Sequence, residues 1–130
     1  MQKKIVKIFA PAKLNIFLRV LSKRKDGFHN IRTGITFINL FDVVEIKESD
    51  KLQISYKGKF KPFRETYDDC IIYKTLEFLK LNNNLNVEIN VEKNIPVQGG
   101  LGSASTNAAA LIQGLEKMHV IDKRNYRDYN

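Results

Sequence analysis

A strand followed by a glycine-rich loop and a helix is the feature that most restricts the fold of this sequence. Apolar and polar side chains alternate from residue 85 to residue 92, which predicts a β-strand with one buried face. Pro96 and the run Gly99-Gly100-Leu101-Gly102-Ser103 come next, and we call residues 96–103 the glycine loop. An apolar stripe at helical spacing then runs from Ala104 to Leu115, so backbone amides converge where this helix begins.

The glycine loop has the composition of a phosphate site. Glycines allow a close approach of the backbone to a ligand, and a helix N-terminus offers unpaired N–H groups and a positive dipole end. Ser103, Ser105 and Thr106 add hydroxyls for phosphate oxygens or a magnesium ion. The loop lacks the Gly-Lys-Ser/Thr of a Walker P-loop, and Ser105 stands where a dinucleotide fingerprint requires Gly or Ala. A tight strand-to-helix connection without a ligand is the alternative interpretation.

The rest of the chain predicts a two-layer α+β fold with a mostly antiparallel sheet packed against helices. Alternating residues 14–20 predict a strand with one face in the core, followed by a hairpin turn at Asp26-Gly27. Further strands are predicted at residues 31–40, 42–46 and 52–56. Asp68 and Asp69 stand where helix caps stand, ahead of a helical run through Leu79.

Composition limits the class of protein. The 130 residues make one domain with a net charge of +8, and residues 1–64 hold 15 Lys/Arg against 5 acidic residues. A basic half suits an anionic partner, either nucleic acid or a phosphorylated small molecule, although a solvated basic surface is equally compatible. A single cysteine, Cys70, and the lack of an apolar run long enough for a signal peptide or a membrane span lead us to expect a cytoplasmic protein.

A second group of polar residues opens the first long strand, at Pro11-Ala12-Lys13-Leu14-Asn15. Alternation predicts that Lys13 and Asn15 share a polar face with Phe17 and Arg19. Beside an anion-binding loop, the lysine would neutralise charge and the asparagine would orient a hydroxyl, as phosphoryl transfer requires. A solvated lysine at a sheet edge is the alternative.

Two segments together resemble the GHMP (galactose, homoserine, mevalonate, phosphomevalonate) kinases: PAKLNIFLRVLSKRKDGFHNIRTGITFINLFDVVEI and IPVQGGLGSASTNAA. The superfamily signature Pro-x-x-x-Gly-Leu-Gly-Ser is present as residues 96–103. Pro-Ala-Lys-Leu-Asn followed by Asp-Gly-Phe-His is similar to the 4-diphosphocytidyl-2-C-methyl-D-erythritol kinases of non-mevalonate isoprenoid synthesis. The likeness runs from about residue 8 to residue 115. It implies the N-terminal lobe of this fold, which is similar to a domain of a small-subunit ribosomal protein.

The resemblance also implies roles for individual residues. Lys13 matches a catalytic lysine that acts on the acceptor hydroxyl, and Asn15 matches a polar residue of the same site. Phe28 and His29 match the aromatic–His pair that holds the cytosine ring of the substrate. The match to the ATP-binding residues covers Lys93 (near the adenosine), Pro96, Gly99, Gly100, Leu101, Gly102, Ser103, Ala104, Ser105 and Thr106. Ser105 is the candidate ligand for magnesium brought in with ATP.

Each of these roles has a structural alternative. Phe28 could be a core residue of the hairpin and His29 a surface residue. Lys93 could be a solvated lysine, and Asn107 a structural residue of the first helical turn. Cys70 stands where the family commonly has an asparagine near the adenosine, and we interpret it as a buried structural thiol. Gln98, Ser103 and Ala104 also stand at positions that are often glycine in the 4-diphosphocytidyl-2-C-methyl-D-erythritol kinases.

By resemblance, the expected activity is ATP-dependent phosphorylation of the 2-hydroxyl of 4-diphosphocytidyl-2-C-methyl-D-erythritol. These kinases are about twice as long, a two-domain size, and their catalytic aspartate lies in a Gly-x-Asp segment beyond the helix that follows the loop. We therefore interpret residues 1–130 as an N-terminal, ATP-binding domain that lacks its C-terminal lobe. Alone, it is expected to be nearly inactive and to expose the face meant for that lobe.

Two alternatives remain open on the sequence. One is an RNA-binding module built on the same fold, which the basic charge favours. The other is a GHMP kinase for a different small alcohol, such as mevalonate or homoserine, against which Phe28 and His29 argue.

Overall fold

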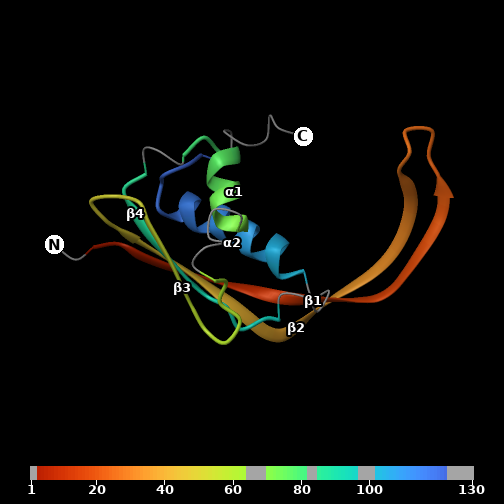
Figure 1. Cartoon of the computed structure of the whole chain (residues 1–130), viewed down its shortest axis with the longest axis horizontal. Helices are drawn as coiled ribbons and strands as arrows, with labels where there is room; N and C mark the ends of the chain where they lie inside the picture. The colour runs from red at the N-terminus through yellow and green to blue at the C-terminus, as the bar shows by residue number, and fades with distance from the viewer. Residues whose placement is uncertain (1–2, 64–69, 82–84, 97–101, 123–130) are drawn as a thin grey trace.

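The computed structural model describes residues 3–63, 70–81, 85–96 and 102–122, without the side chain of Leu18. The elements in these ranges are β1 (Ile5–Lys23), β2 (His29–Glu48), β3 (Gln53–Lys57), α1 (Ile71–Phe78), β4 (Val87–Glu92) and α2 (Ser103–Lys117). The strands form one sheet in the order β1-β2-β4-β3, and the two helices lie on one side of it (Figure 1). The predicted α+β class with two layers is confirmed.

The sheet is mixed because of how the chain connects its strands. β1 pairs antiparallel with β2, and β2 pairs antiparallel with β4. β3 pairs parallel with β4, because the chain between them passes through α1 and returns in the same direction, as a crossover connection requires. The strands predicted at 31–40 and 42–46 are one continuous strand, β2.

The hydrophobic core lies between the sheet and the helices. Val44 and Ile46 on β2 and Ile89 on β4 point toward Leu111 and Leu115 of α2, and all five are fully buried. Alternation along β4 is complete, since every second side chain from Val87 is buried, as the sequence predicts. The helix predicted from Ala104 is α2, which begins one residue earlier. The predicted caps Asp68 and Asp69 lie outside the described residues, and Cys70 is the N-cap of α1.

The outer halves of β1 and β2 leave the sheet as a two-stranded arm (residues 14–37), which curves toward the side that carries the helices (Figure 1). β4 pairs only with Val43–Glu48 of β2, so the arm has no third strand among the described residues. The predicted core face of residues 14–20 is wrong: Leu14 is 45%, Ile16 65% and Val20 61% exposed. Alternation identifies residues that share a face, but no described element covers this one.

No described helix is long and apolar enough to cross a membrane.

Candidate functional site

The site is built around the N-terminus of α2. Its N-cap, Gly102, has a left-handed backbone with φ of 67°, and no side chain caps the helix in the described part of the chain. The first turn carries no acidic residue that would compete with an anion. The first-turn N–H groups therefore point out of the helix as donors. Gly99, Gly100 and Leu101, which were predicted to bind phosphate, lie outside the described residues, and their role stays a prediction.

Lys13 of β1 lies across Gly102. A methyl group added at Gly102 would be 2.5 Å from Lys13 Cε and 2.8 Å from both Cδ and Cγ. The aliphatic part of the lysine thus packs directly on the backbone at the start of α2, a contact that only glycine permits. β1 has a register shift between Pro11 and Lys13, and such irregularities redirect a side chain. The structure therefore places the predicted catalytic lysine at the predicted phosphate-binding helix.

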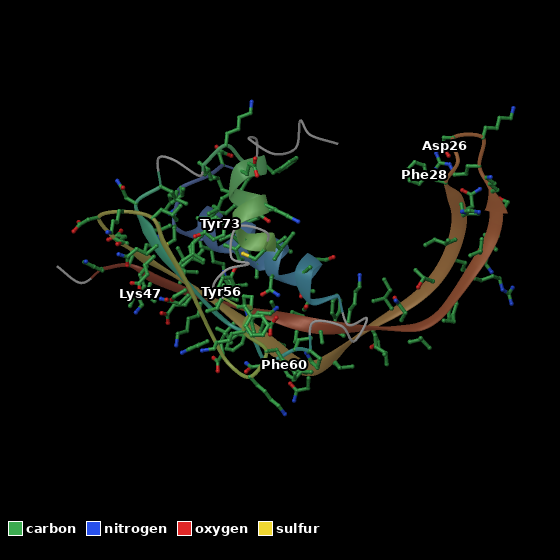
Figure 2. The ribbon with its side chains drawn as sticks, viewed as in Figure 1. Asp26, Phe28, Lys47, Tyr56, Phe60 and Tyr73 are labelled. Carbon is green, nitrogen blue, oxygen red and sulfur yellow. The ribbon has the colours of Figure 1, made fainter. Side chains whose placement is uncertain are left out.

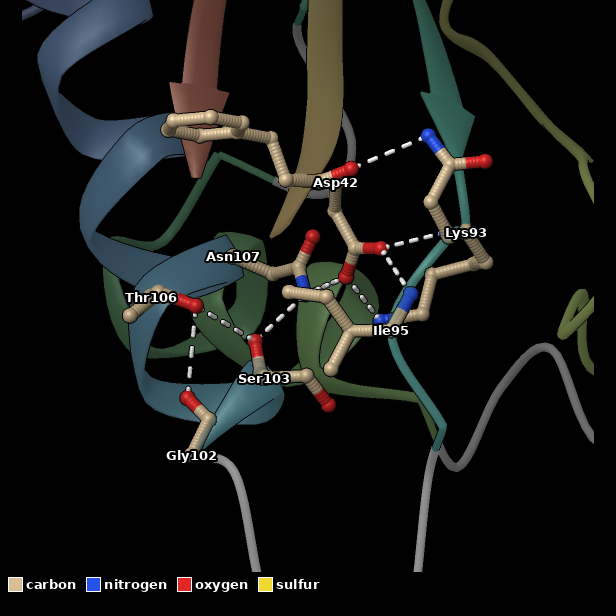
Figure 3. A network of polar contacts seen from close by, with 9 residues as sticks. Asp42, Lys93, Ile95, Gly102, Ser103, Thr106 and Asn107 are labelled. Carbon is tan, nitrogen blue, oxygen red and sulfur yellow. Dashed lines mark hydrogen bonds and ion pairs between the residues drawn. The ribbon is translucent and has the colours of Figure 1, made fainter. Parts of the chain in front are cut away.

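A buried carboxylate, Asp42 of β2, ties this region together (Figure 3). Its Oδ1 accepts hydrogen bonds from the backbone N–H of Asn94, at 2.6 Å, and of Ile95, at 2.9 Å. Its Oδ2 accepts from Lys93 Nζ at 2.6 Å and from Asn107 Nδ2 at 2.8 Å. One carboxylate thereby joins β2, the segment that leaves β4 and the first turns of α2.

This network decides two of the structural alternatives. Lys93 is buried and paired with Asp42, so the interpretation of a solvated lysine is wrong. Asn107 is buried as well and also donates to the carbonyl of Ser103, which confirms a structural role for it. Sequence reasoning missed Asp42. The available signal was a single acid in the apolar run Phe41-Asp42-Val43-Val44, where an unpaired charge would be costly.

A pocket of about 140 Å³ opens beside the start of α2. Its apolar wall comes mainly from Tyr56, Phe60, Pro62, Ile71, Ile72 and Val91, and its polar groups belong to Lys93, Cys70, Ser103 and Asn107. Lys93 and Cys70, both expected near the adenosine, thus line the same pocket. Cys70 is half-buried and shares a hydrogen bond with the hydroxyl of Tyr56. A mostly apolar recess with a few polar groups is the usual form of a small-molecule site.

The hydroxyls predicted for phosphate differ in availability. Thr106 Oγ1 donates back to the carbonyls of Gly102 and Ser103, at 3.3 and 3.2 Å. Ser103 is buried, whereas Ala104 and Ser105 are exposed. In the described part of the chain, no three His, Cys, Asp or Glu side chains gather as metal ligands. The neutral hydroxyl of Ser105 fits a magnesium ion held mainly by nucleotide phosphates, since Mg²⁺ binds proteins through few ligands.

The residues predicted to bind the cytosine ring lie elsewhere. Phe28 is at the far end of the arm from α2 (Figure 2) and is 70% exposed, so its interpretation as a hairpin core residue is wrong. His29, which begins β2 next to it, is exposed, as the alternative expected. Asn15 is exposed at the base of the arm. A register shift between Asn15 and Phe17 interrupts the alternation, so the polar face predicted for residues 13–19 is not one regular face.

Comparisons with known proteins show which family these features resemble. The sequence profile of the GHMP kinases N terminal domain matches residues 70–128, which include α1, β4 and α2. A 4-diphosphocytidyl-2-C-methyl-D-erythritol kinase of Prochlorococcus marinus is 37% identical over 114 residues, covering 85% of this chain and 35% of the relative. The enzyme of the same name from Geobacillus kaustophilus is 39% identical over 118 residues, covering 85% and 39%. Residues 70–128 thus match the N-terminal domain of the GHMP kinases, and most of the chain is similar to these two enzymes.

Solved structures agree with this family. The crystal structure of a 4-(cytidine 5'-diphospho)-2C-methyl-D-erythritol kinase superposes with a TM-score of 0.69 at 27% identity, covering 90% of this chain and 42% of that one. A mevalonate kinase superposes with a TM-score of 0.57 at 19% identity, covering 90% and 41%, and shares the fold alone. The chain spans between 35% and 40% of the length of the curated relatives it matches.

Proposed function

We propose that this chain is the ATP-binding N-terminal domain of a kinase that phosphorylates the 2-hydroxyl of 4-diphosphocytidyl-2-C-methyl-D-erythritol. The observation that carries the proposal is the contact of Lys13 with Gly102, at the uncapped start of α2. It joins a cation to a set of convergent backbone donors, the two features that phosphoryl transfer requires of a protein. The names of the relatives supply the substrate.

In this proposal the γ-phosphoryl group passes directly from ATP to the acceptor hydroxyl. The N–H groups at the start of α2 hold the nucleotide phosphates, together with the predicted donors of the glycine loop. The ammonium of Lys13 neutralises charge on the transferred group beside the acceptor. The pocket lined by Lys93 and Cys70 holds the adenine base. The hydroxyl of Ser105 would help to hold a magnesium ion brought in with ATP, and the ion would neutralise charge on the phosphates.

The arm supplies the acceptor side. Phe28 presents an exposed ring on which a cytosine can stack, and the imidazole of His29 can read its polar edge. The exposed apolar side chains along the arm form a hydrophobic surface of the kind that marks a protein–protein contact. We propose that a C-terminal lobe packs on this surface, supplies the catalytic aspartate and closes over the substrate.

Nucleotide binding by the 130-residue chain is the first test. Calorimetric titration with Mg-ATP is expected to show saturable binding. Lys13→Ala is expected to weaken that binding, and in a kinase that joins this domain to a C-terminal lobe it should lower turnover by a far larger factor than it lowers the affinity for ATP. Unchanged turnover in that variant would remove Lys13 from the mechanism. Inhibition of turnover by CDP would favour the cytidine substrate over mevalonate or homoserine.

The same titration separates the kinase from an RNA-binding module. The arm exposes Arg19, Lys23 and Arg24, and Arg24 is already paired with Asp26 at 2.8 Å. Binding of a single-stranded RNA that falls steeply with salt, without any affinity for Mg-ATP, would overturn the kinase proposal in favour of that module.

A further inference from the structure

We propose that Asp42 is a positioning residue that fixes the end of β4 and the start of α2 relative to each other. This inference rests on the proposed function, because it concerns the two elements that flank the proposed phosphate site. Asp42 lies on β2, and none of the roles assigned above from the sequence includes it.

The carboxylate of Asp42 lies between the two flanks of the proposed phosphate site, which are the end of β4 and the start of α2. On one flank, Asp42 Oδ1 binds the consecutive amides of Asn94 and Ile95, at 2.6 and 2.9 Å. On the other flank, Oδ2 binds the side-chain amide of Asn107, at 2.8 Å, one turn into α2. The separation and direction of the two flanks therefore depend on one carboxylate anchored in the sheet. Asn94 adds a second bond to β2, since its Nδ2 donates to the carbonyl of Phe41 at 2.9 Å.

The chemistry of the group supports a role beyond packing. Asp42 is fully buried, and a buried ion pair such as Asp42–Lys93 stabilises a fold no better than apolar residues of similar size. An apolar pair, however, could not accept hydrogen bonds from Asn94, Ile95 and Asn107. A carboxylate accepts up to four donors with two oxygens, and Asp42 uses this capacity fully, with two donors on each oxygen. Lys93 neutralises the charge at 2.6 Å.

Positioning and folding can be separated in a background without the buried cation. Lys93→Met removes the ammonium, so that Asp42→Asn and Asp42→Ala can then be compared without leaving an unpaired lysine. The Asp42→Asn side chain keeps an oxygen for the amides of residues 94 and 95. Its amide N–H can donate to Asn107 Oδ1 once the Asn107 amide turns over, because Asn107 Nδ2 now faces residue 42 and Oδ1 is buried without a hydrogen-bond partner in the described part of the chain. The Asp42→Ala side chain offers no acceptor at all. Both double variants are neutral at these two positions and lose the same lysine.

The dissociation constant of Mg-ATP is measured for both double variants by calorimetry, together with their thermal midpoints. Asp42→Ala/Lys93→Met is expected to bind at least about tenfold more weakly than Asp42→Asn/Lys93→Met, because active sites tolerate little misplacement of their donors. Val87→Ala, added to the Asp42→Asn double variant, is the matched control. Val87 is buried at the opposite end of β4, so the control lowers the midpoint without touching the site. Leu85→Ala serves the same purpose if a larger loss is needed.

The outcomes distinguish the inference from the function on which it rests. Asp42 serves folding alone if the two double variants bind Mg-ATP with equal affinity. The same conclusion follows if the Val87→Ala control, at the same thermal midpoint as Asp42→Ala/Lys93→Met, loses as much affinity for Mg-ATP as that variant does. If the unaltered chain binds no Mg-ATP, the proposed function fails, and hydrogen exchange then decides the inference. The amides of Asn94 and Ile95, which donate to Asp42, and of Thr106, which donates to the carbonyl of Gly102, are expected to exchange much faster in the Asp42→Ala double variant than in the control. Equal exchange would overturn the positioning role.

Discussion

Gly102→Ala tests the contact between Lys13 and the start of α2. The substitution has two separable costs. Gly102 has φ of 67°, and a residue with a Cβ loses roughly 1–2 kcal/mol of stability in that conformation. The new methyl group would also lie 2.5 Å from Lys13 Cε, well inside the roughly 3.5–4 Å of an ordinary carbon–carbon contact. The lysine stem is flexible, so it moves by about 1 Å or more at little further cost to folding.

The displacement of Lys13 determines the effect on nucleotide binding. Two unit charges at about 4 Å attract by about 4 kcal/mol in a surface site of effective dielectric constant about 20, and at about 5.5 Å by about 3 kcal/mol. Moving the ammonium from about 4 Å to about 5.5 Å from a bound phosphate therefore weakens binding by about 1 kcal/mol, which is roughly a fivefold loss of affinity. Calorimetric titration with Mg-ATP measures this loss, and urea unfolding measures the separate loss of stability.

Gly27→Ala is the matched control, because Gly27 also has a positive φ, of 92°, but nothing lies within 4 Å of an added Cβ in the described part of the chain. It is expected to lose stability in the arm and to keep its affinity for Mg-ATP. A Lys13→Ala background supplies the second control, since Gly102→Ala then has no stem to displace. The reasoning is refuted if Gly102→Ala binds Mg-ATP as tightly as Gly27→Ala. The proposed contact is equally refuted if Gly102→Ala causes the same loss of affinity for Mg-ATP in the Lys13→Ala background.

Three further predictions concern the packing and electrostatics of the domain, and urea unfolding tests each of them. Gly114→Ala is expected to lower the free energy of unfolding by about 1 kcal/mol net, because the strain of overpacking exceeds the gain in helix propensity. The added methyl group would lie 2.6 Å from Ile46 Cδ1. Ile46→Val in the same chain removes that methyl contact and should recover part of the lost stability. Burial acts to raise the pKa of Glu45, but Lys47 and Lys7 outweigh it and hold that pKa below 4.5. The stability that Glu45 contributes is thus complete above pH 4.5 and is lost as the pH falls through its lowered folded value, and Lys47→Gln should reduce this acid-dependent loss. Val20→Thr on the exposed arm should change stability by less than about 0.5 kcal/mol, whereas Val44→Thr in the core should lose at least about 1 kcal/mol.

The part of the fold that could be predicted from the sequence is the part where local pattern and burial agree. Alternation at residues 85–92 and the apolar stripe after Ala104 correspond to β4 and α2, because both elements turn a patterned face toward one core. The arm carries a similar pattern at residues 14–20, and there the inferred burial is wrong. A period of two is set by the backbone of a strand, whereas burial depends on whether another layer lies against it.

The sequence pattern could suggest the glycine loop and Lys13 separately as parts of a phosphate site, but only the resemblance joined them into one site. Lys13 and Gly102 are far apart in the sequence, and no periodicity indicates that they meet. The same holds for Asp42, whose partners Lys93 and Asn107 are 51 and 65 residues away. Local reasoning could identify Asp42 as an unusual charge in an apolar strand. The acceptor role of its carboxylate depends on how β4 and α2 are folded against β2, which only the structure shows.

The two halves of the proposed active site lie on parts of the chain with opposite physical properties. The described part of the nucleotide side is attached to the core through Asp42 and the packing of α2. The acceptor side, Phe28 and His29, lies on a two-stranded arm without a core of its own among the described residues. Lys13 lies where β1 passes from the sheet into the arm, and it contacts the start of α2. A lobe that packs on the arm would therefore set the position of the acceptor relative to a fixed nucleotide, so arm substitutions should alter acceptor use while the affinity for Mg-ATP stays unchanged.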